Sequence, residues 1–273
     1  MELFVSDLDG TLLNKQSKVS DKTKELLNEL MASGVQFTIA TARTHATVVE
    51  LLEGLNITLP IVLMNGVGVY NLKERKYIEI IDVEKNVMQR VLSVFETFNL
   101  EPMLYGIKED ELFVYYRQLT NEAALSFYKL RCDAKLKTFV QVEAFENVVA
   151  ENAMVNMLVF DEFEKIKAAA EKIQDIEGIT VTYYSMDNGL GYMELHSAKA
   201  SKANGIKALT KYASFEHIIG FGDNLNDLPM FSLAHEAYAT SNAIEELKAV
   251  ATGVIGHHDE DGVAQYIKQR HQK

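Results

Sequence analysis

The feature that most constrains this chain is a rhythm of apolar, strand-like runs and amphipathic helices that occurs at both of its ends. In the first eighty residues, Leu3–Ser6 and Val35–Ala40 alternate with segments whose apolar residues share one helical face. Ile61–Met64 continues this series as a third buried strand. The rhythm returns from about residue 199, with His217–Gly220 as its next strand. Such alternation predicts parallel strands that are covered by helices.

The rhythm changes in the middle of the chain. Strand candidates over 179–184 and 191–195 are separated only by Ser185–Gly189. Strands joined by so short a turn pair antiparallel, so this section reads as an α+β unit. We therefore predict a discontinuous α/β core, a three-layer Rossmann-like parallel sheet, that is interrupted by an inserted α+β domain. The expected boundaries are residues 1–81 and 193–273 for the core and 82–192 for the insertion.

Composition narrows the expected partners. The 273 residues contain no apolar run near the length of about 18 residues that a membrane helix needs, so no membrane span is expected. The N-terminus carries early acids and no basic leader, and Cys132 is the single cysteine. Both features favour a cytoplasmic protein without disulfides. A net charge of −12 disfavours binding to nucleic acid or anionic lipid, so we expect a small-molecule partner.

Two acids follow the first strand directly. Asp7 and Asp9 stand at its carboxyl end, the edge at which open parallel sheets bind ligands. One carboxylate could attack an electrophile while the other moves protons, or both could help to hold a hard cation such as Mg2+. Gly10 lets the backbone turn sharply after the pair. The alternative is a loop in which the acids only cap backbone groups.

A second acidic cluster follows His217–Gly220. Asp223 and Asp227 supply hard oxygen ligands, and Asn226 supplies an amide that can contact an anion without adding negative charge. This cluster alone could simply cap the following helix. Two clusters at equivalent strand ends fit that interpretation poorly, and a single shared site fits them better.

A site made only of carboxylates would repel a phosphate, so cations and donors are also needed. Thr41, at the end of the second strand, offers a hydroxyl and a backbone N–H. Arg43 follows closely and could contact a substrate. Lys202, at the start of a helix, could reach a phosphate as a point charge. Each of these residues is a weak signal alone, since a single lysine is more often a solvated surface residue than a ligand.

Taken together, these stretches resemble the haloacid dehalogenase superfamily of phosphohydrolases, and more narrowly its Cof-type members with an inserted α+β (type IIB) cap. The resemblance covers essentially the whole chain. Two positions depart from the pattern, because Ala42 and Ala203 stand where the family often has glycine. Asn65-Gly66 and the tail segment 259–264 also look like Cof-type features. The four matching motifs are Asp7–Leu12, Ile39–Arg43, Lys199–Lys202 and Gly222–Asp227.

The resemblance implies a site and a mechanism. Asp7 would be the nucleophile that forms an aspartyl-phosphate, and Asp9 would be the general acid and base. Mg2+ would be held by Asp7, Asp9 and Asp223, while Asp227 would orient the metal shell. The inserted domain would act as a cap that reads the leaving group of the substrate. The groups expected to hold the phosphate oxygens are Leu8, Thr41, Ala42, Lys202 and Asn226.

The sequence therefore predicts a Mg2+-dependent phosphatase for small phosphorylated metabolites, such as sugar phosphates or vitamin-related phosphates. A phosphomutase or phosphotransferase would share Asp7 and Asp9, and a non-catalytic module could merely bind phosphate or Mg2+. His257 and His258 are adjacent and lack the usual spacing of metal ligands, so a solvated loop is expected there. Gly66-Val67-Gly68 is interpreted as a turn rather than a nucleotide loop.

Overall fold

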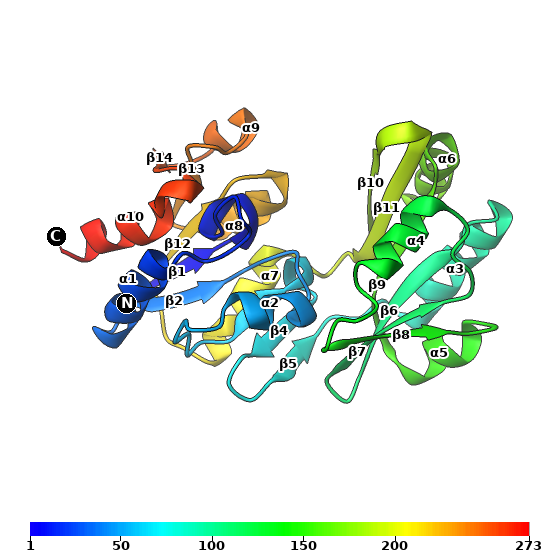
Figure 1. The fold of residues 1–273 in the computed structure, drawn as a ribbon, viewed down its shortest axis with the longest axis horizontal. Helices are drawn as coiled ribbons and strands as arrows, with labels where there is room; N and C mark the ends of the chain where they lie inside the picture. Colours follow the sequence, from blue (N-terminus) through cyan, green and yellow to red (C-terminus); the bar gives the residue numbers. More distant parts are fainter. Residues whose placement is uncertain (273) are drawn as a thin grey trace. The chain divides into compact units, whose positions relative to one another are not determined.

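The computed structural model describes residues 1–272, which form two compact units (Figure 1). Met1–Glu79 and the chain from Ser201 onward form the first unit, and Ile80–Ala200 form the second. The predicted boundary at residue 192 lies inside β11 (Leu190–Ser197). That strand pairs with β10 (Ile179–Ser185) from Gly191 to Ser197, so it lies entirely in the second unit.

A parallel sheet of five strands forms the centre of the first unit, in the order β14-β13-β12-β1-β2. β12 lies in the middle, β1 lies between β12 and the edge strand β2, and all four strand pairs are parallel. The carboxyl ends of these strands therefore share one edge, as predicted. The bounds are Glu2–Ser6 for β1, Gln36–Ile39 for β2, His217–Gly222 for β12, Glu236–Thr240 for β13 and Gly253–Ile255 for β14.

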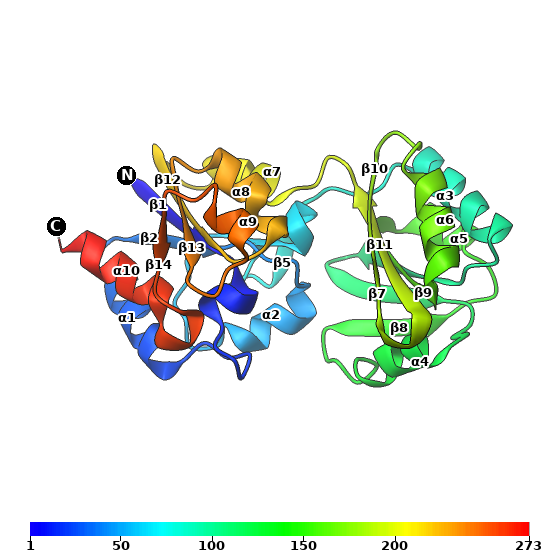
Figure 2. The ribbon, with the colours of Figure 1, turned by 90° about the horizontal axis from the view of Figure 1, so that it is seen from above.

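Helices cover both faces of this sheet (Figure 2). On one face, Val5 of β1 packs in a core with Ile206 of α7 (Lys202–Ala208) and Met230 of α8 (Leu228–Leu233). On the other face, Phe221 of β12 contacts Tyr266 of α10, which packs against α1. The predicted three-layer α/β core is thus confirmed. The other helices are α1 (Asp21–Ala32), α2 (His45–Leu51), α9 (Glu245–Lys248) and α10 (Gly262–His271).

The third predicted parallel strand behaves differently. β3 (Ile61–Leu63) belongs to a separate sheet, in the order β3-β4-β5, and pairs antiparallel with β4 (Gly68–Asn71). Its parallel contact with the main sheet is the single bridge between Ala40 and Val62. The bridge agrees with the predicted parallel direction, but β3 pairs mainly with β4, because the turn over Met64–Gly66 reverses the chain at once and brings β4 alongside it. β5 covers Lys76–Ile80.

The second unit is an α+β fold, as predicted. Its six-stranded sheet has the order β10-β11-β9-β6-β7-β8. Most pairs are antiparallel, but β7 and β8 are parallel, because the long connection through α4 carries the chain back before β8 begins. The strands are β6 (Pro102–Lys108), β7 (Glu111–Tyr116), β8 (Lys137–Gln141), β9 (Ala153–Glu162), β10 (Ile179–Ser185) and β11.

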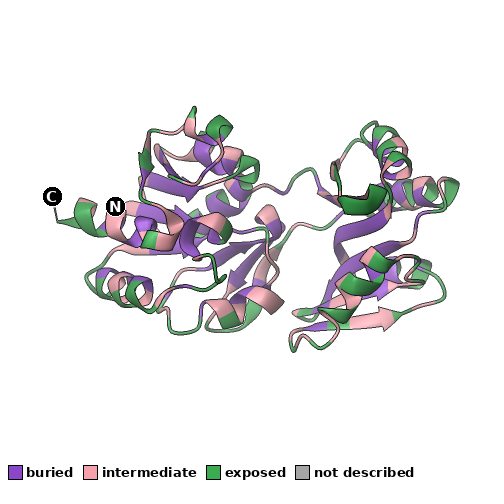
Figure 3. Ribbon diagram, turned by 45° about the horizontal axis from the view of Figure 1, so that its top comes forward, coloured by how far each residue is buried: buried purple, intermediate pink, exposed green. Residues whose placement is uncertain are grey.

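Helices pack on this sheet to form a second hydrophobic core, in which Val91, Ile166 and Met157 are fully buried. Figure 3 shows these strands as a mainly buried layer beside helices with an exposed outer side. Each unit therefore has a core of its own. The helices are α3 (Lys85–Thr97), α4 (Glu122–Lys129), α5 (Glu146–Glu151) and α6 (Phe163–Ile173). Within residues 1–272, no helix combines the length and the apolar content needed to cross a membrane.

Candidate active site

Asp7 lies at the carboxyl end of β1, which is flanked by a strand on each side. Its backbone N–H donates to the carbonyl of Phe221 on β12 at 3.0 Å, so the parallel sheet itself positions the residue. Leu8–Leu12 then form one wide turn, which the N–H of Leu13 closes on the carbonyl of Leu8 at 2.8 Å. Because this turn follows the strand without a spacer, the Asp7 side chain is buried at the sheet edge.

Lys202 is the buried cation of the site. Its Nζ lies 2.5 Å from Oδ1 of Asp7 and 2.6 Å from Oδ1 of Asp227, and the residue is only 1% exposed. Ser201 caps α7 by accepting the N–H of Asn204 at 3.1 Å, which places Lys202 at the first helical position. Burial alone would lower the pKa of Lys202, but the two carboxylates outweigh it, so the pKa lies above its usual value. Lys202 is therefore a charged bridge between two acids.

Asp227 uses both of its carboxylate oxygens for hydrogen bonds. Oδ1 accepts from Lys202, and Oδ2 accepts the backbone N–H groups of Asp223 at 2.9 Å and Asn224 at 3.2 Å. Asn224 and Asp227 form a reciprocal capping box at this turn. Asp227 thereby holds both the lysine and the backbone on which Asp223 stands.

Asp223 faces the turn that follows Asp7. Its Oδ1 accepts the Thr11 hydroxyl at 3.3 Å. A Cβ on Gly10 would lie 2.3 Å from Oδ2 of Asp223, and Gly10 has φ +70°, so glycine is required there on two grounds. Asp7, Asp223 and Asp227 each offer an oxygen within 4.8 Å of the others. The two predicted acidic clusters thus meet at one place.

The charge balance of this group fits a divalent cation. Three carboxylates face one lysine ammonium at a largely buried site. Burial is the main cause that raises the pKa of Asp7 to about 8 and that of Asp223 to about 6, and neighbouring carboxylates add to both shifts. A hard cation with oxygen ligands would offset this excess of negative charge.

Asp9 points away from this buried group and is paired with Arg43. The guanidinium donates Nε to one carboxylate oxygen at 2.7 Å and a terminal nitrogen to the other at 2.6 Å. The Asp9 side chain is 53% exposed. The sequence placed Arg43 near the substrate but did not reveal that it holds Asp9. A two-pronged pair of this kind fixes the orientation of the carboxylate.

Asn65 links Thr41 to Asn226 by hydrogen bonds. The sequence marked Asn65 as a family feature but did not place it in the site. Thr41 follows β2, and its carbonyl accepts the N–H of Asn65 at 2.9 Å. Asn65 in turn accepts the amide of Asn226 at 3.5 Å. The Thr41 hydroxyl accepts the N–H of Arg43 at 3.2 Å, which leaves its own proton available. The signal for Asn65 was its place directly after β3, at the same edge.

The remaining predicted residues lie beside these groups in the chain. Leu8 is fully buried, so only its backbone can serve a ligand, whereas Ala42 is exposed next to Thr41. Ala203 follows Lys202 in the first turn of α7. The structure thus gathers the acids, the lysine and the threonine at the carboxyl edge of the sheet.

The chain thus combines an α/β core, an inserted α+β unit, and acids at two strand ends that meet a buried lysine at the start of α7. A family model described as haloacid dehalogenase-like hydrolase matches residues 4–267. The chain therefore belongs to this family and is an enzyme of the hydrolase class.

Comparisons with individual proteins agree over the full length of the chain. Phosphatase YwpJ of Bacillus subtilis is 29% identical, with 98% of this chain and 99% of the relative covered. The 5-amino-6-(5-phospho-D-ribitylamino)uracil phosphatase YwtE of the same organism is also 29% identical, with 98% of each covered. A haloacid dehalogenase-like hydrolase from Bacteroides thetaiotaomicron has the same fold, with a TM-score of 0.80, 21% identity, and 98% and 99% of the two chains covered. A subclass IIB sugar phosphatase shares it with a TM-score of 0.76, 21% identity and 99% of each chain covered.

Proposed function

We propose that this protein is a Mg2+-dependent phosphatase that hydrolyses phosphate monoesters of small metabolites through an aspartyl-phosphate on Asp7. One observation carries the proposal. Asp7 is buried at the end of β1, with one oxygen held by Lys202 at 2.5 Å and with Asp223 beside it. A nucleophile needs such a fixed geometry, and an incoming phosphate needs such a cation.

Two bond exchanges account for the reaction. An oxygen of Asp7 forms a bond to phosphorus while the bond to the ester oxygen breaks, and Asp9 gives its proton to the departing oxygen. Water then attacks the phosphorus of the aspartyl-phosphate, Asp9 takes a proton from that water, and the carboxylate of Asp7 leaves with its electron pair. The products are an alcohol and inorganic phosphate.

The other residues would bind and orient the transferred group. Mg2+, when bound to Asp7, Asp223 and the backbone carbonyl of Asp9, supplies positive charge that neutralises the phosphate oxygens. Asp227 keeps Lys202 and the Asp223 backbone in place. The proposed phosphate contacts are the N–H groups of Leu8 and Ala42, the Thr41 hydroxyl, the Lys202 ammonium and the Asn226 amide.

For the substrate, we propose phosphorylated polyols, sugars or vitamin-related compounds. The printed name of YwtE specifies a phosphorylated ribityl compound, and that relative matches over 98% of this chain. The inserted unit is proposed to select the substrate, with a boundary near Ile80 and Ala200 rather than at 82 and 192. We propose the cytoplasm as its location, because the chain carries a single cysteine.

Activity against a panel of phosphorylated metabolites, with and without Mg2+, tests this proposal. We expect phosphate release that requires Mg2+ and that Asp7→Asn abolishes, because an amide is a far weaker nucleophile than a carboxylate. Undiminished release by Asp7→Asn would contradict the assignment of the nucleophile. Phosphate transfer to a second hydroxyl, dependent on an activating bisphosphate, would instead identify a phosphomutase. A stable phosphoenzyme without turnover would identify a binding module.

A further inference from the structure

Side chains from the C-terminal part of the first unit form hydrogen bonds with the turn after Asp7. The carbonyl of Gly10 accepts two hydrogen bonds, one from the Asn242 amide at 2.8 Å and one from the Thr240 hydroxyl at 3.2 Å. At the end of the same turn, the Leu13 carbonyl receives Nδ1 of His258 at 2.6 Å. A carbonyl can only accept, so Nδ1 of His258 carries the proton in this contact.

Asn242 is itself fixed on both sides. Its Oδ1 accepts the backbone N–H of His258 at 3.2 Å, while its amide nitrogen donates to Gly10. These two bonds determine which way the amide points. In the reverse orientation the NH2 group would face the His258 N–H, and the oxygen would face the Gly10 carbonyl. One asparagine thus links the turn after β1 to the segment that precedes α10.

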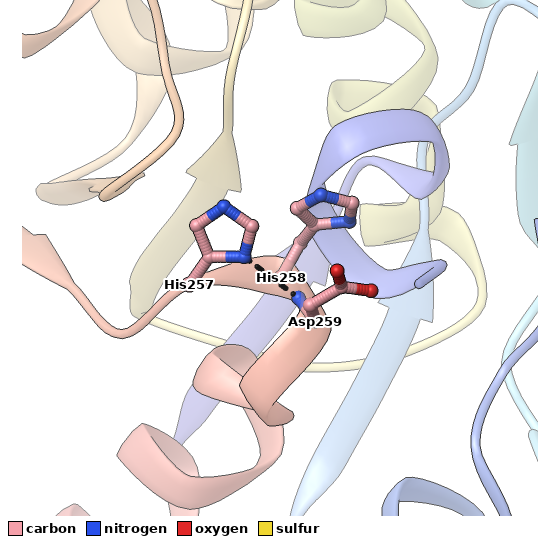
Figure 4. A group of neighbouring side chains, drawn as sticks. All are labelled: His257, His258 and Asp259. Carbon is pink, nitrogen blue, oxygen red and sulfur yellow. Dashed lines mark hydrogen bonds between the residues drawn. The ribbon is translucent and has the colours of Figure 1, made fainter. Parts of the chain in front are cut away.

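His257, His258 and Asp259 come close enough together to suggest a metal site (Figure 4). Their hydrogen bonds instead indicate a structural role. Nδ1 of His257 accepts the backbone N–H of Asp259 at 3.1 Å, and Oδ1 of Asp259 accepts the N–H of Lys15 at 2.7 Å. Together with the bond from His258 to Leu13, these contacts close the segment over the turn and the residues that follow it. Residues 257–259 therefore hold this turn in place, and they are called the brace of the turn below.

The position of Gly10 matters because its neighbours belong to the site. Asp9 precedes it, and Thr11, whose hydroxyl donates to Asp223, follows it. The Gly10 carbonyl and the Thr11 N–H belong to one planar peptide group, so fixing the carbonyl also fixes the start of Thr11. The close approach of Gly10 to Asp223 leaves little room for movement.

We propose that Asn242, supported by Thr240, is a positioning residue that holds the Gly10 peptide and thereby sets the placement of Asp9 and Thr11 for the reaction. This inference rests on the proposed function for its effect on activity, and on the hydrogen bonds alone for its effect on the turn. Asn242 does not contact the reacting atoms, so it acts through the backbone of the turn.

Asn242→Asp replaces the amide donor with an oxygen that repels the Gly10 carbonyl. We expect kcat to fall by roughly tenfold to a hundredfold, because displacements near 1 Å can cost that much, while KM changes by less than about threefold. Amide hydrogen exchange within residues 8–13 should become faster. Thr240→Val removes only the longer bond and should show a smaller change in the same direction. Asn71→Asp is the matched control, because Asn71 serves a distant turn as an acceptor for the N–H groups of Lys73 and Glu74.

The two readouts separate the two ideas. If Asn242→Asp leaves both kcat and exchange in 8–13 unchanged, the inference is wrong. If exchange accelerates but the parent protein releases no phosphate from any substrate, the proposed function fails and the brace stands. If Asn242→Asp does not fold, Thr240→Val decides, and a parental kcat and exchange rate in that variant would overturn the inference.

Discussion

Lys202 is the residue whose place in the site is clear from the structure but hardly visible in the sequence. In the sequence it is one lysine among many, and the signs of its function are its position at a helix start and the match of Lys199–Lys202 to a family motif. In the structure it is buried between Asp7 and Asp227, 195 and 25 residues away along the chain. A buried ammonium is tolerated only with such partners. No local pattern contains this pairing, because the two acids arrive from different strands.

Arg43 is the residue whose role the structure changes most. Its two hydrogen bonds to Asp9 depend on a planar, forked guanidinium, which lysine lacks. We therefore expect Arg43→Lys to lower kcat by roughly tenfold, a part of what general acid–base catalysis supplies, with little change in KM. Steady-state kinetics on the best substrate of the panel measures both constants.

Arg75→Lys is the control for this change, since Arg75 lies exposed in the turn between β4 and β5. The alternative result is equally informative. A raised KM with an unchanged kcat would show that Arg43 contacts the substrate, as the sequence alone suggested, and that its bond to Asp9 does not matter for the reaction.

At the scale of elements, the sequence predicted the main strands and helices but missed some connections. The rhythm of apolar runs was enough to place β1, β2 and β12, since each is buried on both faces. β14 covers only Gly253–Ile255 at the sheet edge, which is too short for a period to be seen. β4 begins with Gly68, which was interpreted as part of a turn, so no strand was predicted there. Pairing partners depend on the path of the chain and not on the strand itself.

An unusual element of the second unit is β8, which carries a buried lysine. Lys137 is 5% exposed, and its ammonium lies 5.5 Å from the ring centre of Tyr105 and 5.6 Å from that of Phe139. Within residues 1–272, no hydrogen bond or ion pair reaches this ammonium, and the two rings are its recorded contacts. Burial, with a smaller effect from Arg131, lowers the pKa of Lys137 to about 8. The folded state therefore disfavours the charged lysine.

The sign of the pH dependence follows from this shift. The folded pKa near 8 lies below the ordinary lysine pKa of 10.5. Between these pH values the unfolded chain therefore binds more protons, and the free energy of unfolding rises with pH. We expect Lys137→Met to raise the free energy of unfolding at pH 7 by up to about 3 kcal/mol and to flatten the rise between pH 8 and 10. Urea unfolding at pH 7 and at pH 10, followed by circular dichroism, measures the free energy of unfolding at each pH.

Lys129→Met, at an exposed position at the end of α4, controls for the general effect of adding a methionine. It should leave the pH dependence as in the parent. If Lys137→Met instead destabilised the protein at pH 7, the ammonium would have a favourable partner in solution, and the interpretation of burial as a net cost would be wrong.

At the scale of the whole molecule, the discontinuity of the core was the most accessible prediction. One rhythm stops and later resumes, and only an insertion explains why strands β1 and β12, over 200 residues apart, are hydrogen-bonded neighbours. The exact boundary was not accessible. β11 continues to Ser197 because its pairing with β10 continues, and composition does not change at residue 192.

Because the two units have separate cores, we can predict which residues a bound ligand protects from hydrogen exchange. Asp7, Lys202, Asp223 and Asp227 all belong to the first unit. A ligand that binds only the folded site stabilises it by about 2.7 kcal/mol at a hundred times its dissociation constant. We expect Mg2+ with inorganic phosphate to slow amide hydrogen exchange most in peptides covering residues 7–13 and 222–227. Peptides from β6 and β9, in the core of the second unit, should change less.

Asp223→Asn should weaken the protection, because it removes one carboxylate proposed to hold the cation. Protection confined to the second unit, or equal protection in Asp223→Asn, would show that the ions bind elsewhere.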